Sequence, residues 1–262
     1  DNSGFFDNVA ASQPNAEPSV AAAIASTGVA LDRNEVGGDK YSGVRLTTLW
    51  QPIDQLSFTL AYTQQKIDQE GFPEAHNNLP GDFQQIRLRT GAGGSNDGFM
   101  ENQIDITNLV IEYDIGWGSI MSSSSWVDYD TTSEVDLSFF LASPFYGKTN
   151  TVDEVFVEEL RLSSRLDGPF QFLVGLYYED SEFTTDSQTL WSGDVTLDSG
   201  LALFDIDRHK ATDQKALFGE LEYAITETIS ATLGARYFDY DQNFSESTLL
   251  LGTAIIDDSS SK

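Results

Sequence analysis

The residues best suited to chemistry are few, and they lie in polar stretches. The run DYDQN places Asp239, Asp241 and Asn243 at alternate positions, a set of hard oxygen ligands that suits Ca²⁺. The run lacks the glycine and the distal glutamate of an EF-hand loop. An acidic surface rim is therefore the preferred interpretation, with bound divalent ions as the alternative.

The chain has two histidines, His76 and His209, each within a polar stretch. Contact with a ferric ligand is one interpretation, and a solvent-exposed loop side chain is the preferred one. No Ser-His-Asp set forms a recognisable motif, and no pair of carboxylates carries a known acid–base signature. We therefore expect a protein that is not an enzyme and needs no cofactor or metal.

The glycine-rich run GAGGSNDG, residues 91–98, resembles a phosphate-binding loop only superficially. It lacks the G-K-[ST] ending and does not lead from a buried strand into a helix, so we predict a flexible loop. Four aromatic residues in polar stretches are candidate ligand contacts, and packing of the loops on one another explains them equally well. These residues are Phe72, Phe83, Tyr146 and Trp191.

Composition excludes several classes of function. The 262 residues carry a net charge of −28 with only 14 Lys and Arg, which argues against nucleic acid as a partner because phosphate contacts need cations. The absence of cysteine excludes disulfides, thiolate zinc sites and a cysteine nucleophile. Acidic loops repel anions, so a sugar or a metal complex fits better than a phosphate ligand. Charge alone does not identify the substrate.

The chain has no stretch that is typical of a membrane helix or of an export signal. No stretch approaches the roughly 18 consecutive apolar residues of a membrane-spanning helix. The run VAAAIASTGVAL, residues 20–31, looks like a signal core, but no Lys or Arg precedes Arg33, so the basic region of a signal peptide is missing. We predict that this run is loop, with one helical turn at most.

Period-two alternation dominates the rest of the chain. In FQFLVGLYYED, residues 170–180, the even positions are apolar and the odd positions are mixed. Such alternation indicates strands whose two faces have different surroundings. The same pattern recurs in residues 41–50, 56–65, 216–224 and 229–238.

Connections between these strands alternate strictly between short and long, which predicts eight antiparallel strands in four hairpins. The short connections are 51–55, 116–118, 165–169 and 226–228, and the long polar ones are about 68–102, 130–153 and 184–212. Long loops gathered at one end are unusual in compact soluble domains. Outer-membrane barrels have short periplasmic turns and long extracellular loops. We therefore predict an all-β fold, a segment of an antiparallel transmembrane β-barrel.

Strand length agrees with a membrane location. Eleven residues at about 3.3 Å each, tilted by about 45°, cover roughly 25 Å, the height of the apolar band of such a barrel. Aromatic residues lie near both strand ends, as in interfacial girdles. The residues predicted to face lipid are Val44, Leu46, Trp50, Leu56, Phe58, Leu60, Tyr62, Phe170, Phe172, Val174, Leu176, Tyr178, Leu217, Leu221, Tyr223, Ile229, Leu233 and Tyr237.

Glu158 conflicts with this pattern, because it shares parity with Phe156, Leu160 and Leu162. A charge on the lipid face near the midplane costs about 2–4 kcal/mol. We therefore expect Glu158 to lie above the apolar band, toward the long loops.

Three segments resemble the barrel of TonB-dependent receptors: GFFDNV (4–9), EELRLSSRLDGPFQFLVGLYYED (158–180) and KALFGELEYAITETISATLGARYFDYD (215–241). In that family a strand reading E-L-R-L-S-S precedes a short turn and a G-L-Y-Y strand. A later F-G-E-x-x-Y hairpin leads to G-x-R-Y. The resemblance covers most of residues 40–241 and implies a barrel of about 22 strands, plugged in its lumen, of which this chain holds about a third.

The expected organisation is a single partial barrel domain over residues 1–262. Residues 1–39 and 243–262 are predicted extracellular loops that flank the barrel hairpins of residues 40–242. Both ends therefore lie on the long-loop side, and the final DDSSSK lacks a terminal aromatic residue. We expect an internal fragment without the plug domain and its energy-coupling box.

The resemblance implies active uptake across the outer membrane of a Gram-negative bacterium. The expected solute is scarce and bulky, such as a ferric siderophore, vitamin B12 or an oligosaccharide, and it binds as a small-molecule or metal-chelate ligand at the extracellular mouth. The other implied partners are outer-membrane lipid and lipopolysaccharide, whose phosphates divalent ions would bridge to an acidic rim. The inner-membrane TonB complex is expected to act through the missing plug.

Two alternatives remain open at this point. The first is a self-contained small outer-membrane barrel of eight strands, an allowed closed size, with a structural or adhesion role. The second is a soluble extracellular β-repeat protein. A soluble protein tolerates lysine at Leu60 or Leu233, whereas a barrel with these residues in lipid fails to insert.

Overall fold

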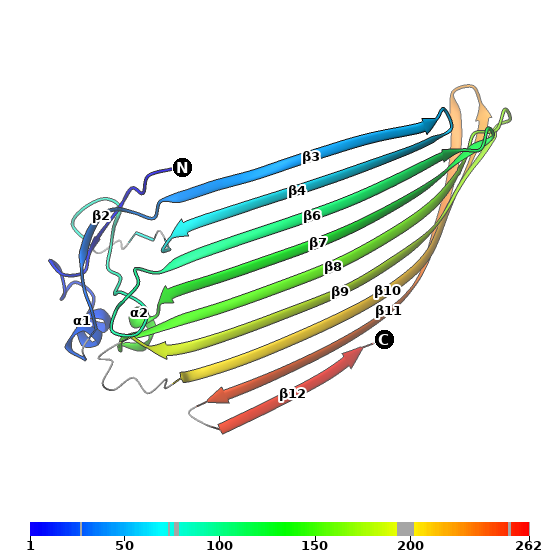
Figure 1. Ribbon diagram of the computed structural model, residues 1–262. Helices are drawn as coiled ribbons and strands as arrows, with labels where there is room; N and C mark the ends of the chain where they lie inside the picture. Colours follow the sequence, from blue (N-terminus) through cyan, green and yellow to red (C-terminus); the bar gives the residue numbers. More distant parts are fainter. Residues whose placement is uncertain (27, 73, 76–78, 193–201, 251–252, 262) are drawn as a thin grey trace.

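A nine-stranded antiparallel sheet forms most of the protein, and a small unit lies at one end of it (Figure 1). The computed structural model describes residues 1–26, 28–72, 74–75, 79–192, 202–250 and 253–261. The strand order is β12-β11-β10-β9-β8-β7-β6-β4-β3. The strands are β3 (Asp39–Ile53), β4 (Leu56–Glu70), β6 (Phe99–Asp114), β7 (Gly118–Asp136), β8 (Phe145–Ser164), β9 (Phe170–Trp191), β10 (Ala202–Thr226), β11 (Ile229–Leu250) and β12 (Thr253–Ser261).

All four predicted hairpins are present, which confirms the fold class. They are β3–β4, β6–β7, β8–β9 and β10–β11. Their short connections lie together at one end of the sheet, here called the turn end, at the right of Figure 1. The opposite end, where the longer connections lie, is called the loop end.

The strands extend further toward the loop end than predicted. Strand β7 continues to Asp136 and β8 begins at Phe145, so much of the predicted loop 130–153 is strand. The predicted loop 184–212 is reduced in the same way, because β9 ends at Trp191 and β10 begins at Ala202. Polar side chains pair across these strands, as do the Thr151 and Thr185 hydroxyls at 2.5 Å. Polar composition here therefore indicates hydrogen-bonded strand rather than loop.

The predicted loop of residues 243–262 is wrong in its secondary structure. Strand β11 runs on to Leu250, and β12 returns beside it from Leu250↔Thr253 to Gln242↔Ser261. The sheet is open among the described strands, with β3 and β12 at its two edges. Figure 1 shows these edge strands apart, so the chain does not have the closed eight-stranded barrel of the first alternative.

Residues 1–39 are likewise folded rather than wholly loop. Strands β2 (Asp32–Val36), β1 (Phe6–Val9) and β5 (Gln84–Gln85) form a second sheet in that order, with β1 antiparallel to β2 and parallel to β5. This sheet, with the segments around it, is called the small unit. Its buried core consists of Ala10, Val20, Ala23, Leu79, Ile86 and Leu88.

Two short helices complete the small unit. Helix α1 (Pro18–Ala25) is longer than the single turn predicted for this run, because alanine favours helix and proline is tolerated in a first turn. Helix α2 (Ser138–Leu141) follows β7. Among the described residues, no helix has the length and apolar character needed to cross a membrane.

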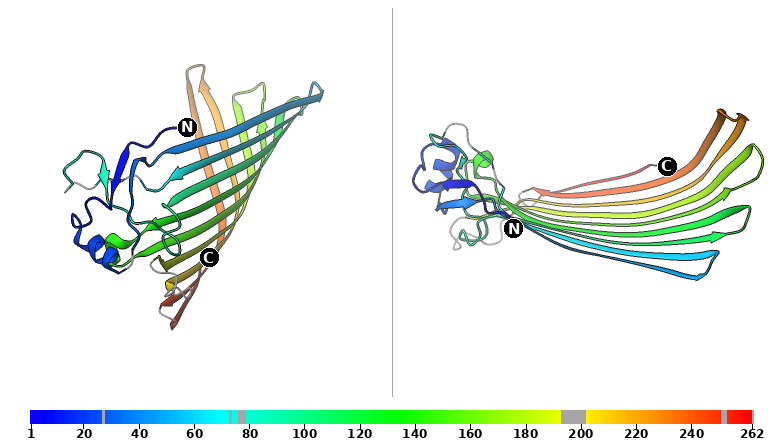
Figure 2. Two further views of the ribbon diagram at one scale, coloured as in Figure 1. Left: turned by 60° about the vertical axis from the view of Figure 1, so that its left-hand side comes forward. Right: turned by 90° about the horizontal axis from the view of Figure 1, so that it is seen from above.

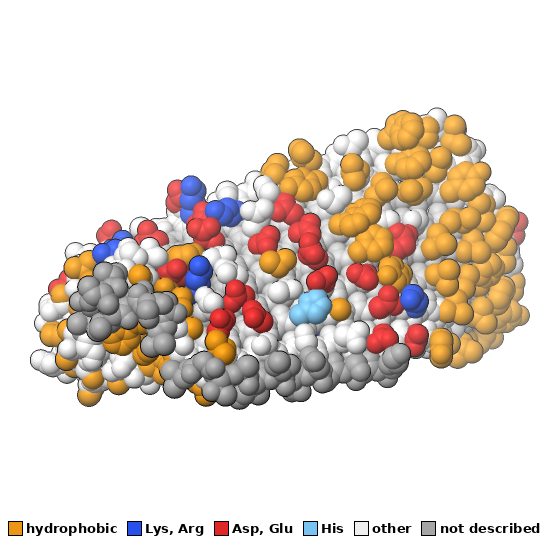
Figure 3. All heavy atoms as spheres, turned by 60° about the horizontal axis from the view of Figure 1, so that its bottom comes forward, with side chains coloured by type: hydrophobic (Ala, Val, Ile, Leu, Met, Phe, Trp, Pro, Cys, Tyr) orange, Lys and Arg blue, Asp and Glu red, His pale blue; other side chains and the backbone are white. Residues whose placement is uncertain are grey.

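One face of the large sheet carries all the residues that were predicted to face lipid. Antiparallel partners share a face, and the register joins Trp50↔Phe58 at one side of the sheet to Leu217↔Tyr237 at the other. This face is called the apolar face. Figure 3 shows that its hydrophobic side chains form a band at the turn end and that acidic side chains lie beyond the band toward the loop end.

Glu158 lies where charged residues begin on the apolar face, because it pairs with Tyr178, which pairs with Lys215 on β10. On the apolar face, Phe156 lies one step further toward the loop end and packs against Trp126, with ring centroids 5.3 Å apart. The Glu158 carboxylate instead accepts hydrogen bonds from the hydroxyls of Ser122, at 2.7 Å, and Ser124. These donors satisfy a charge that would otherwise be unpaired among apolar neighbours.

The opposite face of the sheet is mixed and contains close packing around one glycine. The Phe218 ring lies directly over Gly175, where an added Cβ would approach the ring to 2.2 Å. On the two strands that flank β10, the guanidinium of Arg236 on β11 lies 5.0 Å from the centre of the Tyr177 ring on β9. Figure 2 shows that the sheet curves along its length and that the small unit lies wholly at the loop end.

Candidate functional site

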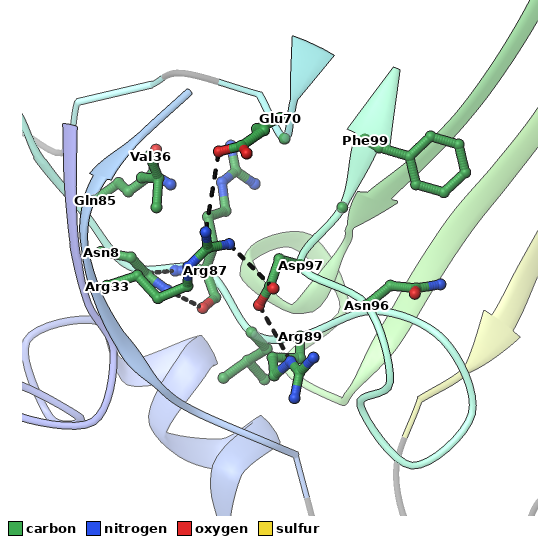
Figure 4. Close-up of a pocket in the computed structure, with 13 residues that line it drawn as sticks. Asn8, Arg33, Val36, Glu70, Gln85, Arg87, Arg89, Asn96, Asp97 and Phe99 are labelled. Carbon is green, nitrogen blue, oxygen red and sulfur yellow. Dashed lines mark hydrogen bonds and ion pairs between the residues drawn. The ribbon is translucent and has the colours of Figure 1, made fainter. Parts of the chain in front are cut away.

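A cavity of about 320 Å³ separates the small unit from the loop end of the large sheet (Figure 4). Strands β1, β2 and β5 line one side, and the ends of β4 and β6 line the other. Three arginines face this cavity: Arg33 from β2, and Arg87 and Arg89 from the segment after β5. This arrangement is called the arginine pocket.

Asn8 fixes the backbone on one side of the pocket. Its amide nitrogen donates to the carbonyl oxygens of Leu31, at 3.0 Å, and Arg87, at 2.9 Å. Its amide oxygen accepts from the Arg87 backbone N–H at 2.9 Å. One buried side chain therefore joins three segments that are distant in the sequence, and this sets the position from which Arg87 projects.

Asp136 anchors the same segment to the large sheet. Its carboxylate accepts from the backbone N–H of Leu88 and of Ser138, both at 2.9 Å, and from the Ser138 hydroxyl at 2.8 Å. Asp136 lies at the loop end of β7, well outside the apolar band. Burial raises the pKa of this carboxyl, and the hydrogen bonds from Ser138 and Leu88 oppose that rise.

The glycine-rich segment 91–98 forms a tight turn that closes the pocket. Thr90 and Asn96 exchange two backbone hydrogen bonds of 2.8 Å, and Gly91, Gly94 and Gly98 have positive φ angles that glycine adopts without steric cost. The N–H groups of Thr90, Gly94 and Asn96 are all used within the turn. The segment therefore forms a hydrogen-bonded turn, which places Asn96 and Asp97 in the pocket lining.

Two of the arginines, Arg33 and Arg89, are joined through a carboxylate, as Figure 4 shows. Asp97 lies between these two, 3.0 Å from the Arg33 Nη1 atom and 3.1 Å from the Arg89 Nε atom. Glu70 lies 4.0 Å from Arg33. Arg87 pairs with Glu74, whose side chain is 65% exposed.

Arg87 is the most enclosed of the three arginines. Its side chain is 14% exposed, and its Nη1 atom donates to the Asp136 carbonyl oxygen at 3.3 Å. Its Nε atom is buried without a hydrogen-bond partner among the described residues. A planar guanidinium in this setting suits an oxyanion that accepts two hydrogen bonds at once.

The four aromatic candidates do not gather around this pocket. Phe83 is exposed and packs against Phe5 and Phe6 in the small unit. Tyr146 is buried in β8, and Trp191 at the end of β9 packs edge-on against Phe145. Phe72 is half-buried beside Gly71. Their role as ligand contacts stays a prediction.

The other candidates lie on or near the large sheet. His209 is on β10, with its Nδ1 atom 3.5 Å from the Glu182 carboxylate, and His76 lies outside the described residues. Asp239, Asp241 and Asn243 follow one another along the apolar face of β11, paired with β10, so they belong to a strand rather than a loop.

Two clusters of charged side chains were not predicted from the sequence. Asp186, Asp205 and Asp207 bring carboxylates within 4.8 Å of one another, but they come from different strands and need the β9–β10 register to meet. The arginine pocket left one local signal, the RLR of residues 87–89 in a strongly acidic chain. Arg33 joins them only through the pairing of β1 with β2 and β5.

Comparison with known proteins agrees with this architecture. The chain is similar in structure to the ferric yersiniabactin uptake receptor FyuA from Yersinia pestis, with a TM-score of 0.70 and 16% identity over 90% of this chain and 35% of that one. It is also similar to the ferric citrate transporter FecA, with a TM-score of 0.61 and 13% identity over 86% of this chain and 32% of that one. The chain thus spans about a third of the length of these structures.

Sequence comparison is informative at the level of the family. A search of curated proteins gives no match. The family model described as TonB dependent receptor-like, beta-barrel, matches residues 55–261, which include nearly all of the large sheet. The chain therefore belongs to the TonB-dependent receptor family, and it contains part of that family's β-barrel.

Proposed function

We propose that this chain forms part of an outer-membrane receptor that imports a scarce, bulky solute into a Gram-negative bacterium. The observation that carries the proposal is the apolar band on one face of a sheet whose short turns all lie at one end. Family membership supports it, because TonB-dependent receptors are transport proteins.

In this proposal the apolar face contacts lipid and the mixed face looks into the barrel lumen. Leu176, Leu217 and Leu233 are each about half exposed or more on the apolar face, which is unfavourable in water and favourable in a bilayer. The turn end is then periplasmic, and the loop end, with the small unit and the arginine pocket, is extracellular. Lipopolysaccharide would lie beside the acidic part of the apolar face.

Further strands would complete the barrel at the two open edges of the sheet. In a bilayer, unpaired backbone groups of an edge strand cost several kcal/mol each, so β3 and β12 need partners. A plug domain elsewhere in the receptor would contact the inner-membrane TonB complex and use its energy. Such parts would fit within the two thirds of the similar structures that this chain does not cover.

A ferric chelate is the solute class that we favour over vitamin B12 and oligosaccharides. The support is the function of the two similar structures, a ferric yersiniabactin uptake receptor and a ferric citrate transporter. Sequence identity of 16% and 13% transfers the fold and not the ligand, so the solute has to be measured.

Deletion of the gene in its native host tests the proposal. We expect slower growth in iron-limited medium and reduced accumulation of radioactive iron supplied as a chelate, both restored by the intact gene. Dissipation of the proton gradient should reduce uptake in the complemented strain to the level of the deletion strain. Normal uptake of iron, vitamin B12 and oligosaccharides, together with a loss of adhesion, would contradict transport and favour the adhesion role.

A further inference from the structure

We propose that the arginine pocket binds an acid group, carboxylate or phosphate, of a small soluble ligand, and that this group replaces Glu74 as the ionic partner of Arg87. The proposal rests on the proposed receptor function, and it specifies the chemistry of the ligand at the extracellular side. The ligand group would bind the guanidinium of Arg87 in exchange for Glu74.

The concentration of positive charge is the first argument. Three of the 14 Lys and Arg of the chain line this one cavity, although the chain carries a net charge of −28. Most of the surface of such an acidic protein repels anions. A cavity with Arg33, Arg87 and Arg89 is therefore the place among the described residues where an anion meets several cations together.

The weakness of the present partners is the second argument. The side chains of Glu70 and Glu74 are 63% and 65% exposed, and exposed ion pairs contribute little because water and salt screen them. Asp97 differs, since it bridges two arginines at about hydrogen-bonding distance. Asp97 therefore keeps Arg33 and Arg89 in place, while the glutamates can be exchanged for a ligand oxyanion.

The third argument is that Arg87 is already held in position before a ligand binds. Asn8 holds its backbone from both sides, and Asp136 and the large sheet hold the residue after it. Its guanidinium is nearly enclosed, and its Nε atom has no hydrogen-bond partner within the part of the chain that the structure describes. A group that is fixed in advance loses little conformational entropy on binding, so more of the interaction energy appears as affinity.

The size and position of the cavity limit the ligand. A volume of about 320 Å³ admits a small acid or the acidic end of a larger molecule. The pocket lies between the small unit and the loop end of the large sheet, whereas the apolar band lies at the turn end (Figure 3). Phosphates of membrane lipid are therefore out of its reach in the proposed orientation, and a solute in the external medium is the source that fits.

Binding is tested with the receptor purified in detergent as the full chain that the cell makes. Citrate and inorganic phosphate are titrated separately by calorimetry, and we expect saturable binding of at least one, weakened by added salt. Arg87→Gln should weaken it about tenfold or more, since it removes hydrogen bonds from a charged donor. Arg45→Gln on β3 removes the same charge outside the pocket and should leave the affinity unchanged.

Glu74→Gln gives the decisive result, because the two interpretations predict opposite outcomes. If Glu74 competes with the ligand, its removal should tighten binding about two- to fivefold, the scale of an exposed ion pair. Glu227→Gln, in the turn between β10 and β11, is the control for charge and should have no effect. If the pocket is only a structural ion-pair network, the wild-type receptor binds neither anion and Glu74→Gln only lowers stability.

Four outcomes would overturn the proposal: no binding to the wild type, unchanged affinity in Arg87→Gln, unchanged or weaker affinity in Glu74→Gln, or binding restricted to lipopolysaccharide micelles. Each is separate from the fate of the transport proposal. If the receptor imports iron but binds neither anion, only the pocket proposal is rejected. If it binds citrate through Arg87 but imports nothing, only the transport proposal is rejected.

Discussion

The turn end and the loop end of this protein are held together by different interactions. At the turn end, regular backbone pairing joins strands such as β8 and β9 over nearly their whole length, and the exposed apolar band is continuous. At the loop end, single polar side chains such as Asn8 and Asp136 join segments through hydrogen bonds to backbone groups. The first arrangement repeats from strand to strand, whereas the second occurs once.

This difference bears on how each region tolerates change. The band is a collective property, so neighbouring apolar residues compensate for loss of one methyl group, but a charge within it has no partner in lipid. The small unit depends on a few residues, each of which satisfies two or three donors. Its loss should leave the large sheet in place.

The largest effect is expected for Leu233→Lys. Leu233 is 72% exposed on the apolar face and pairs with Leu221, so in a bilayer a lysine there costs about 2–4 kcal/mol. We expect the receptor to be lost from the outer-membrane fraction, as measured by fractionation and by heat-dependent gel migration. Thr232→Lys is the matched control, because Thr232 faces Glu222 on the mixed face and should be tolerated. Normal assembly of Leu233→Lys would mean that this face is not in lipid.

A smaller and local effect is expected for Asp136→Ala. The change leaves the buried N–H groups of Leu88 and Ser138 without their acceptor, at a cost of about 1–3 kcal/mol each. Hydrogen exchange of these two amides should accelerate, while the amides of β8 and β9 stay protected. Asp130→Ala, at an exposed position on the same strand, should change neither. Equal acceleration across the whole sheet would show that the two regions are not independent.

The smallest effect is expected for Gly175→Ala on the mixed face. Its Cβ would lie 2.2 Å from the Phe218 ring, so the ring must move, at a cost of about 1 kcal/mol. Urea unfolding from detergent or lipid should report the loss, and Phe218→Leu in the same chain should recover part of it. Gly168→Ala is the control, since nothing lies within 4 Å of its added Cβ. A cost at Gly168 as large as at Gly175 would exclude ring packing as the cause.

Much of the large sheet was predictable from the sequence. The alternation in residues 170–180 and the turns such as 165–169 gave the four hairpins and the apolar face, because both signals are local. The upper parts of the strands were missed, since residues such as Thr151 and Thr185 are as common in loops as in strands. The partners of Glu158 were not predictable from local sequence, because the hydroxyls of Ser122 and Ser124 that satisfy it lie on another strand.

The arginine pocket was not predictable by the same means. Arg33 lies more than fifty residues before Arg87. Both line the same cavity because β1, which contains Asn8, pairs with β2 on one side and with β5 on the other. No periodic pattern specifies such a meeting. The glycines of 91–98 were recognised, but their positive φ angles and the turn that they build appear only when Thr90 and Asn96 are paired.

The parallel pairing of β1 with β5 also imposes an order of events on folding. Between Asn8 and Gln85 the chain contains β2 and the complete β3–β4 hairpin, so closing this loop costs less entropy once the hairpin has shortened it. The small unit should consequently mature after the first hairpin, with Asn8 capturing the Arg87 backbone as a late step. A pocket that is able to bind its ligand would then indicate that the neighbouring part of the barrel wall has already assembled.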